Sequence, residues 1–268
     1  MNAQSIMLGL VQGLTEFLPV SSSGHLGLAK AAMGVGDMTI AYDVTLHVAT
    51  VLAVIIFFAR DLISLLGEWF YGFFNKNARN WDGWRFGWAV IVGSAVTCPL
   101  GIMLAPYAEA ASANTLWISC GFWITGLLLA SARFITEGDK KIRIIDGAFV
   151  GFVQGLAVMP GVSRSGTTIW AGSMAGLSRE DAFKFSFLLS VPAIVGATFF
   201  EARKLGGYDA FLLALPDGWL QGAVIAFLTG LASLLLLRKL VLSDRWWLFS
   251  VYCMLMGAVS VIFSLVAE

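Results

Sequence analysis

The chain has 268 residues, of which 58% are hydrophobic and only 13% are charged. A soluble domain usually carries charge on about one quarter of its residues, so this composition excludes an ordinary soluble protein and favours a membrane protein. The formal net charge is zero, which says nothing about nucleic acid, but no basic domain is present and no nucleic-acid partner is expected.

The first apolar segment is interrupted in its middle. Neither 3–18 nor 22–34 is long enough to cross a bilayer, which requires about 20 helical residues. Pro19 and the serines at 21–23 separate the two halves, because proline ends a helix and serine can cap the next one. This pattern predicts a re-entrant helix–loop–helix hairpin.

Three transmembrane helices are predicted after this hairpin, at 44–59, 86–108 and 115–132. The shorter run, 44–59, can span if its flanking charges extend to the headgroups. Segment 61–85 is rich in Trp and Phe, which indicates an interfacial helix and loop.

A second interrupted segment, with halves at 147–159 and 166–177, repeats the first. Residues 9–24 read GLVQGLTEFLPVSSSG and residues 151–166 read GFVQGLAVMPGVSRSG, with nine of sixteen positions identical. Three further spans are predicted at 185–200, 218–237 and 246–267.

The topology follows from counting crossings. A hairpin returns to its own side and three crossings change side, so the second hairpin enters from the opposite face. We therefore predict an all-α polytopic membrane protein, a single domain over 1–268 with six transmembrane helices and two re-entrant hairpins in inverted repeats of about 1–134 and 143–268. Irregular backbone in a membrane must face protein or water, so the two breaks are expected to line one polar cavity.

The distribution of basic residues predicts the orientation. One side carries thirteen of them, namely Arg60, Lys76, Arg79, Arg85, Arg133, Lys140, Lys141, Arg143, Arg179, Lys184, Arg238, Lys239 and Arg245. The other side carries Lys30, Arg203 and Lys204. The rich side is predicted to be cytoplasmic, with both termini and the mouth of the first hairpin facing outward.

The polar side chains of the two breaks form the candidate site. They are Gln12, Glu16, Ser21, Ser22, Ser23 and His25 in the first hairpin, and Gln154, Ser163, Arg164, Ser165, Thr167 and Thr168 in the second. Ionisable side chains are costly in a membrane and are therefore functional candidates. The guanidinium of Arg164 matches phosphate oxygens, and amides at a restarting helix bind anions, so the site is suited to phosphate.

Individual roles can be proposed on chemical grounds. Glu16, with Gln12 four residues away on the same helix face, could hold a divalent cation, Mg²⁺ or Ca²⁺. His25 could transfer a proton, and a loop serine could act as nucleophile. Simpler interpretations stay open: Glu16 and Arg164 could form a structural ion pair, while His25 and the serines could only cap helices. His47 is expected to be a packed, hydrogen-bonded histidine within a span.

Two motifs carry a family resemblance. GLTEFLPVSSSGH at 13–25 and PGVSRSGTT at 160–168 resemble the signature motifs of the undecaprenyl-pyrophosphate phosphatases, also called bacitracin-resistance proteins. The resemblance extends over nearly the whole chain, including SFLLSVPAI at 186–194. It implies an enzyme at the outer side of the bacterial inner membrane that converts undecaprenyl diphosphate to undecaprenyl phosphate. That reaction recycles the lipid carrier for peptidoglycan and gives resistance to bacitracin, which acts on the same lipid.

The resemblance also implies roles for residues. Gln12 and Glu16 match the motif (E/Q)xxxE, as acidic or metal-binding positions, although an amide at Gln12 argues against a site with two carboxylates. Ser22 and His25 match the proposed nucleophile and proton-transfer positions, and Arg164 matches the phosphate-binding arginine. The neighbouring hydroxyls of Ser21, Ser23, Ser163, Ser165 and Thr168 would support phosphate binding.

Other functions are compatible with the same pattern. Inverted repeats with broken helices are also a transporter architecture, so a flippase for polyprenyl phosphate is the main alternative. A structural or drug-sequestering membrane protein is the second alternative. The sequence leaves the oligomeric state open, a homodimer included.

Overall fold

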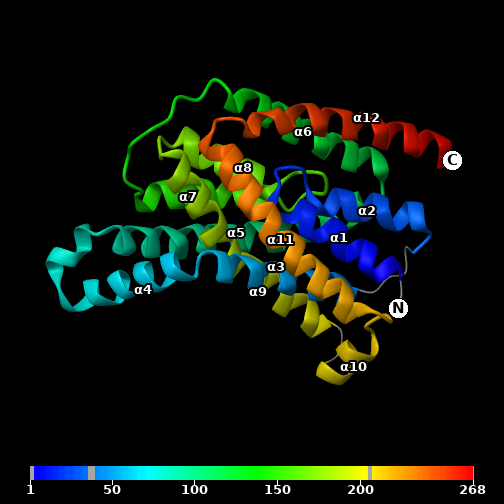
Figure 1. The fold of residues 1–268 in the computed structure, drawn as a ribbon, viewed down its shortest axis with the longest axis horizontal. Helices are drawn as coiled ribbons and strands as arrows, with labels where there is room; N and C mark the ends of the chain where they lie inside the picture. The colour runs from blue at the N-terminus through cyan, green and yellow to red at the C-terminus, as the bar shows by residue number, and fades with distance from the viewer. Residues whose placement is uncertain (1–2, 36–39, 205–206, 268) are drawn as a thin grey trace.

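The computed structural model describes residues 3–35, 40–204 and 207–267, within which every regular element is a helix. The α-helices are α1 (Ala3–Phe17), α2 (Ser22–Met33), α3 (Ile40–Phe57), α4 (Ala59–Phe74), α5 (Asp82–Ser112), α6 (Thr115–Ala132), α7 (Ile144–Leu156), α8 (Arg164–Met174), α9 (Arg179–Lys204), α10 (Tyr208–Leu213), α11 (Trp219–Leu242) and α12 (Phe249–Ala267). Two short 3-10 helices, η1 (Lys76–Asn80) and η2 (Trp246–Leu248), complete the set. Figure 1 shows this arrangement, with α6 and α12 side by side along one edge.

Both interrupted segments fold into helix–loop–helix hairpins, as predicted. Helix α2 packs back on α1, and α8 packs back on α7. Each second helix begins after a serine whose Oγ accepts a hydrogen bond from an amide of the first turn: Ser21 from Gly24 at 3.4 Å, and Ser163 from Gly166 at 3.2 Å. The identical sequence positions of the two copies therefore have the same structural role.

The six predicted spans are confirmed as helices. Among the described residues, α5, α6, α9, α11 and α12 are long and apolar enough to cross a membrane, and α3 with α4 forms a sixth candidate bent by 73°. The expected helix and loop at 61–85 is observed as α4 and η1, although α5 already begins at Asp82. Rings of α4 and α5 pack together, with Phe73 and Trp84 centroids 5.1 Å apart.

The packing of the hairpins follows the inverted repeat. Helix α1 lies on α11, and its counterpart α7 lies on α5. Glycine permits both close approaches, since a Cβ on Gly9 would lie 2.2 Å from the Gly222 carbonyl oxygen and one on Gly151 would lie 2.3 Å from that of Gly93. Each hairpin is therefore held by a transmembrane helix from the other half of the chain.

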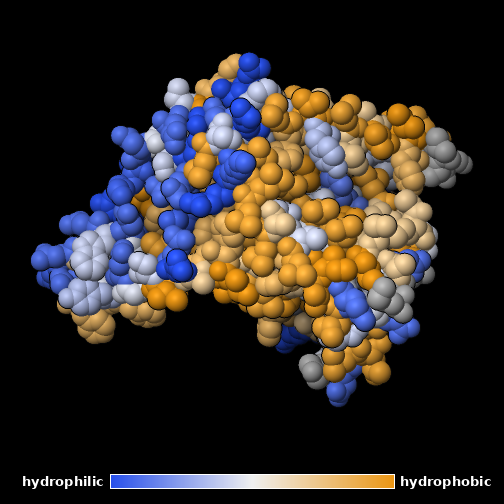
Figure 2. Space-filling view, viewed as in Figure 1, coloured by the Kyte–Doolittle hydropathy of each residue, from blue (hydrophilic) through white to orange (hydrophobic). Residues whose placement is uncertain are grey.

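The surface is that of a protein that crosses a membrane several times. Figure 2 shows hydrophobic side chains over the middle of the molecule and hydrophilic ones gathered at the end that carries the α4–α5 connection. Large apolar side chains on the spans are exposed, including Leu235 at 64% and Leu255 at 61%. At the hydrophilic end, ion pairs tie neighbouring elements together, for example Lys141 to Asp82 at 3.0 Å. Of the three basic residues on the other side, the side chain of Lys204 lies outside the described residues.

Candidate active site

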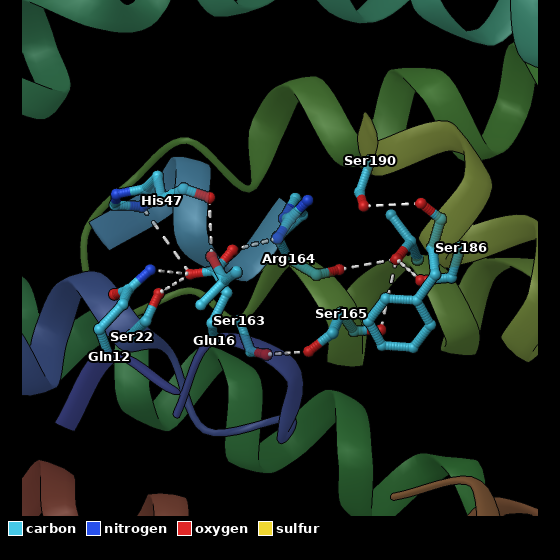
Figure 3. Close-up of polar contacts among 12 residues, drawn as sticks. Gln12, Glu16, Ser22, His47, Ser163, Arg164, Ser165, Ser186 and Ser190 are labelled. Carbon is cyan, nitrogen blue, oxygen red and sulfur yellow. Dashed lines mark hydrogen bonds and ion pairs between the residues drawn. The ribbon is translucent and has the colours of Figure 1, made fainter. Parts of the chain in front are cut away.

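The loops of the two hairpins meet in the interior of the protein, as the sequence predicts. Arg164, the first residue of α8, forms an ion pair with Glu16 near the end of α1 (Figure 3). Beside it, Ser165 Oγ donates a hydrogen bond to the carbonyl oxygen of Leu18 at 3.2 Å. Two contacts therefore join segments that lie 148 and 147 residues apart in the sequence.

The carboxylate of Glu16 is the centre of this site. Its side chain is only 4% exposed. Oε2 accepts hydrogen bonds from Ser22 Oγ at 2.6 Å and from Gln12 Nε2 at 3.0 Å, while Oε1 accepts from Arg164 Nη2. A buried carboxylate with these partners is held as a charged acceptor, because every contacting group donates to it.

Two polar atoms at the site have no hydrogen-bond partner. They are Nη1 of Arg164 and Oε1 of Gln12, and both are buried. A buried polar atom left unpaired costs about 1–3 kcal/mol, more for a charged group, so such atoms in a native protein require an explanation. A free guanidinium donor fits a phosphate oxygen, and a free amide oxygen fits a cation.

The backbone at the start of α8 adds further donors. Ser163 caps the helix, so the amides of Arg164 and Ser165 stand at its first two positions, where no intrahelical acceptor exists. Such amides bind anions with help from the helix dipole. They belong to the same loop as Arg164, whose guanidinium has the unpaired donor.

His25 is directed away from the Glu16 cluster. Nδ1 lies 2.8 Å from the Ser21 carbonyl oxygen, which fixes a hydrogen on this nitrogen, and Nε2 lies 2.7 Å from the hydroxyl of Tyr252 on α12. The two rings are stacked, with centroids 5.6 Å apart. Both ring nitrogens are thus engaged elsewhere, and the proton-transfer role of His25 stays a prediction.

His47 lies at the site, which the sequence did not indicate. The expected hydrogen bond is confirmed, since Nδ1 lies 2.8 Å from the Asp43 carbonyl oxygen. Its Nε2, however, lies 3.8 Å from Glu16 Oε2. The interpretation of His47 as merely packed is therefore incomplete. The only available signal was an ionisable residue inside a predicted span.

The hydroxyls of the second loop mostly hold the loop itself. Thr168 Oγ1 lies 2.8 Å from the Arg164 carbonyl oxygen and 2.5 Å from Ser186 Oγ of α9, and both side chains are buried. Ser163 Oγ lies 3.2 Å from Ser165 Oγ, just as Ser21 Oγ lies 3.3 Å from Ser23 Oγ in the first loop. These residues fix the backbone that presents Arg164, and Thr168 is fully engaged in doing so.

The comparison with known proteins identifies the family. The family model described as bacitracin resistance protein BacA matches residues 5–259, which include both hairpins and their loops. This chain belongs to the BacA family.

Proteins named undecaprenyl-diphosphatase are similar over nearly their whole length. The one from Desulforapulum autotrophicum is 36% identical, with 98% of this chain and 99% of the relative covered. The one from Desulfosudis oleivorans is 38% identical, with 96% of each covered. The one from Treponema denticola is 38% identical, with 95% of this chain and 94% of the relative covered.

For this member of the BacA family, the donor set limits how a cation can bind. The described residues contain no group of three His, Cys, Asp or Glu side chains arranged to hold a metal. Beside Glu16, Oε1 of Gln12 is an oxygen atom that has no hydrogen-bond partner and could therefore be a metal ligand. Magnesium and calcium often complete their coordination with substrate phosphates and waters. The residues therefore fit a cation shared with a phosphorylated substrate rather than one enclosed by protein alone.

The arrangement supports nucleophilic chemistry on phosphorus. A serine hydroxyl donates to a buried carboxylate, which is the relationship of a nucleophile to its general base. An arginine on the opposite hairpin supplies positive charge to the same position. The site is thus complete only when both hairpins are present.

Proposed function

We propose that this chain is a phosphatase that converts undecaprenyl diphosphate to undecaprenyl phosphate and inorganic phosphate. The observation that carries the proposal is the 2.6 Å contact of Ser22 Oγ with Glu16 Oε2, opposite Arg164. The relatives named undecaprenyl-diphosphatase, which match almost end to end, support the same substrate. The reaction recycles the lipid carrier of peptidoglycan synthesis and gives bacitracin resistance, consistent with the family description.

In the proposed mechanism, Glu16 takes the proton of Ser22 as the serine oxygen attacks the terminal phosphorus. The new O–P bond forms while the bridging P–O bond breaks, and the electron pair leaves with undecaprenyl phosphate. Arg164 and the first amides of α8 stabilise the negative charge on the transferring phosphoryl group. Water then attacks the phosphoserine with an imidazole as base; the Ser22 O–P bond breaks, Glu16 returns its proton to the serine oxygen, and inorganic phosphate is released.

Serine attack fits the geometry better than histidine attack. Both ring nitrogens of His25 have partners, Ser21 and Tyr252, whereas the hydroxyl of Ser22 already points at a base. We propose His25 as a proton-transfer group for the second step, after its ring leaves Tyr252. This role needs only a side-chain rotation, because His25 lies three residues after Ser22 in the same helix.

A divalent cation, Mg²⁺ or Ca²⁺, is part of the proposal. Glu16 and Gln12 would hold it together with substrate oxygens. The cation would neutralise charge on the diphosphate. The buried Oε1 of Gln12, which lacks a hydrogen-bond partner, supports this assignment.

The proposed location is the bacterial inner membrane, with the site opening to the outer side and both termini outside. The excess of Lys and Arg at the opposite end supports this orientation. The oligomeric state stays open, a homodimer included.

The test is inorganic phosphate release from undecaprenyl diphosphate by purified protein, with and without a chelator. Release should be lost in Ser22→Ala and Arg164→Ala and kept in Arg60→Ala, which removes an exposed arginine elsewhere. Well-folded protein that releases no phosphate but moves the lipid across vesicles would overturn the proposal in favour of the flippase.

A further inference from the structure

A groove at the hydrophilic end of the molecule is lined mostly by apolar side chains. It encloses about 480 Å³ between the first turns of α5 and the segment that leads into α7. Its lining consists of Trp84, Arg85, Trp88, Ile142, Arg143, Ile144 and Ile145. It lies at the opposite end of α7 from the Arg164 loop, so it is separate from the candidate active site.

The apolar part of this groove is exposed where the protein is otherwise polar. Ile144 is 52% exposed and Ile145 is 64% exposed, next to the charged residues Lys140, Lys141 and Arg143. The indoles of Trp84 and Trp88 form the adjoining wall, with ring centroids 5.8 Å apart. Tryptophan at the end of a membrane span is typical of the headgroup region of the bilayer. An apolar ligand is therefore expected to cover these side chains.

The surface of the groove itself is almost entirely apolar, and its charged residues are Arg85 and Arg143, with no carboxylate residue among those that line it. Arg85 forms no ion pair with any residue that the structure describes, and it is only partly exposed. Arg143 donates to the carboxylate of Asp146 from Nε at 3.3 Å and from Nη2 at 3.4 Å, and Lys140 binds the same carboxylate at 2.7 Å. Two basic side chains therefore share one carboxylate, and together with Arg85 they leave a net positive charge beside the groove.

We propose that this groove binds an anionic phospholipid, with its phosphate between Arg85 and Arg143 and an acyl chain along Trp84, Trp88 and the isoleucines. A ligand with both an apolar body and an anionic head satisfies both parts of the lining. Basic pockets between transmembrane helices on the cytoplasmic side are typical sites for such lipids, and this end carries the excess of basic residues. The lipid would join the start of α5 to the start of α7.

The experiment measures phospholipids that stay bound when the protein is extracted in mild detergent. Mass spectrometry should detect phosphatidylglycerol retained in preference to a zwitterionic phospholipid. Arg85→Gln should lower that retention roughly fivefold, the equivalent of about 1 kcal/mol for one basic side chain at an anionic membrane surface. Arg60→Gln, which removes an exposed charge from the start of α4, should leave retention unchanged.

A second variant tests the groove at a different residue, because replacing Arg85 could change lipid retention indirectly. Ile145→Glu places a negative charge at an exposed position of the groove and should also lower retention of phosphatidylglycerol. Equal retention by wild type, Arg85→Gln and Ile145→Glu would overturn the proposal. So would equal retention of anionic and zwitterionic phospholipids by the wild-type protein.

Discussion

Arg164 and Glu16 form an ion pair across 148 residues of sequence, between the first residue of one hairpin's second helix and the end of the other hairpin's first helix. Both side chains are largely buried, at 18% and 4% exposure. The pair therefore holds together the two loops that make up the candidate active site.

Removing either partner of this pair should destabilise the protein more than removing both. Glu16→Ala leaves a buried guanidinium without its carboxylate, and Arg164→Ala leaves a buried carboxylate without its guanidinium. Breaking one side of a buried pair costs about 3–5 kcal/mol. The double variant should recover part of that loss, as measured by unfolding in detergent. Additive losses would indicate that the two charges do not interact.

Ser22→Ala should lower kcat by at least about 10²–10⁴, the usual contribution of general acid–base catalysis alone, while substrate binding changes little. The reason is that Ser22 donates to Glu16 Oε2 at 2.6 Å, which is the one side-chain hydrogen bond of Ser22 among the described residues. Phosphate release at saturating substrate checks this. Ser243→Ala, in the turn after α11, is the control. Near-normal turnover of Ser22→Ala would show that another group is the nucleophile.

Alanine at Gly9 or Gly151 should destabilise the packing of the hairpins. The added Cβ would lie 2.2 Å or 2.3 Å from a backbone carbonyl oxygen of α11 or α5, which cannot yield as a side chain could. Overpacking of this kind costs about 1–3 kcal/mol. Gly101→Ala is the matched control, because nothing lies within 4 Å of its Cβ position. Thermal unfolding in detergent should separate the three variants, and equal midpoints would contradict the close packing.

Asp146 should contribute stability that depends on pH. Burial alone would raise the pKa of this carboxyl, but hydrogen bonds from Lys140 and Arg143 outweigh it and lower the pKa below its ordinary value. The contribution is therefore complete above the unfolded-state pKa of about 3.9, and it is lost as the pH falls through the lower folded-state pKa.

Asp146→Asn should cost about 1.5–3 kcal/mol at neutral pH, the value of hydrogen bonds to a charged group, and should remove this acid-side dependence. Unfolding measured from neutral to acidic pH checks both effects. Asp82→Asn is the control, since Asp82 is 51% exposed and its pair with Lys141 should contribute little. A similar loss in both variants would show that burial of Asp146 is unimportant.

The apolar runs were sufficient to predict the six spans, and the internal repeat predicted the two hairpins and the meeting of their loops, with a Glu16–Arg164 ion pair as one possible interpretation. Those features follow from local pattern and from the number of crossings. The approach of His47 to Glu16 could not be predicted, because it depends on how α3 is rotated about its axis when it packs on α1, α9 and α11. The contact of His25 with Tyr252 joins residues 227 apart, and neither belongs to a pattern that pairs them.

The exchange of hairpins between the halves has a consequence for biosynthesis. When the ribosome has made only the first half, α11 does not yet exist. Helix α1 and its polar side chains therefore lack the helix that they pack on, which is encoded more than 200 residues later. The halves are interlocked rather than modular, so neither can mature alone. Assembly of both hairpins must therefore finish only after the last spans have inserted.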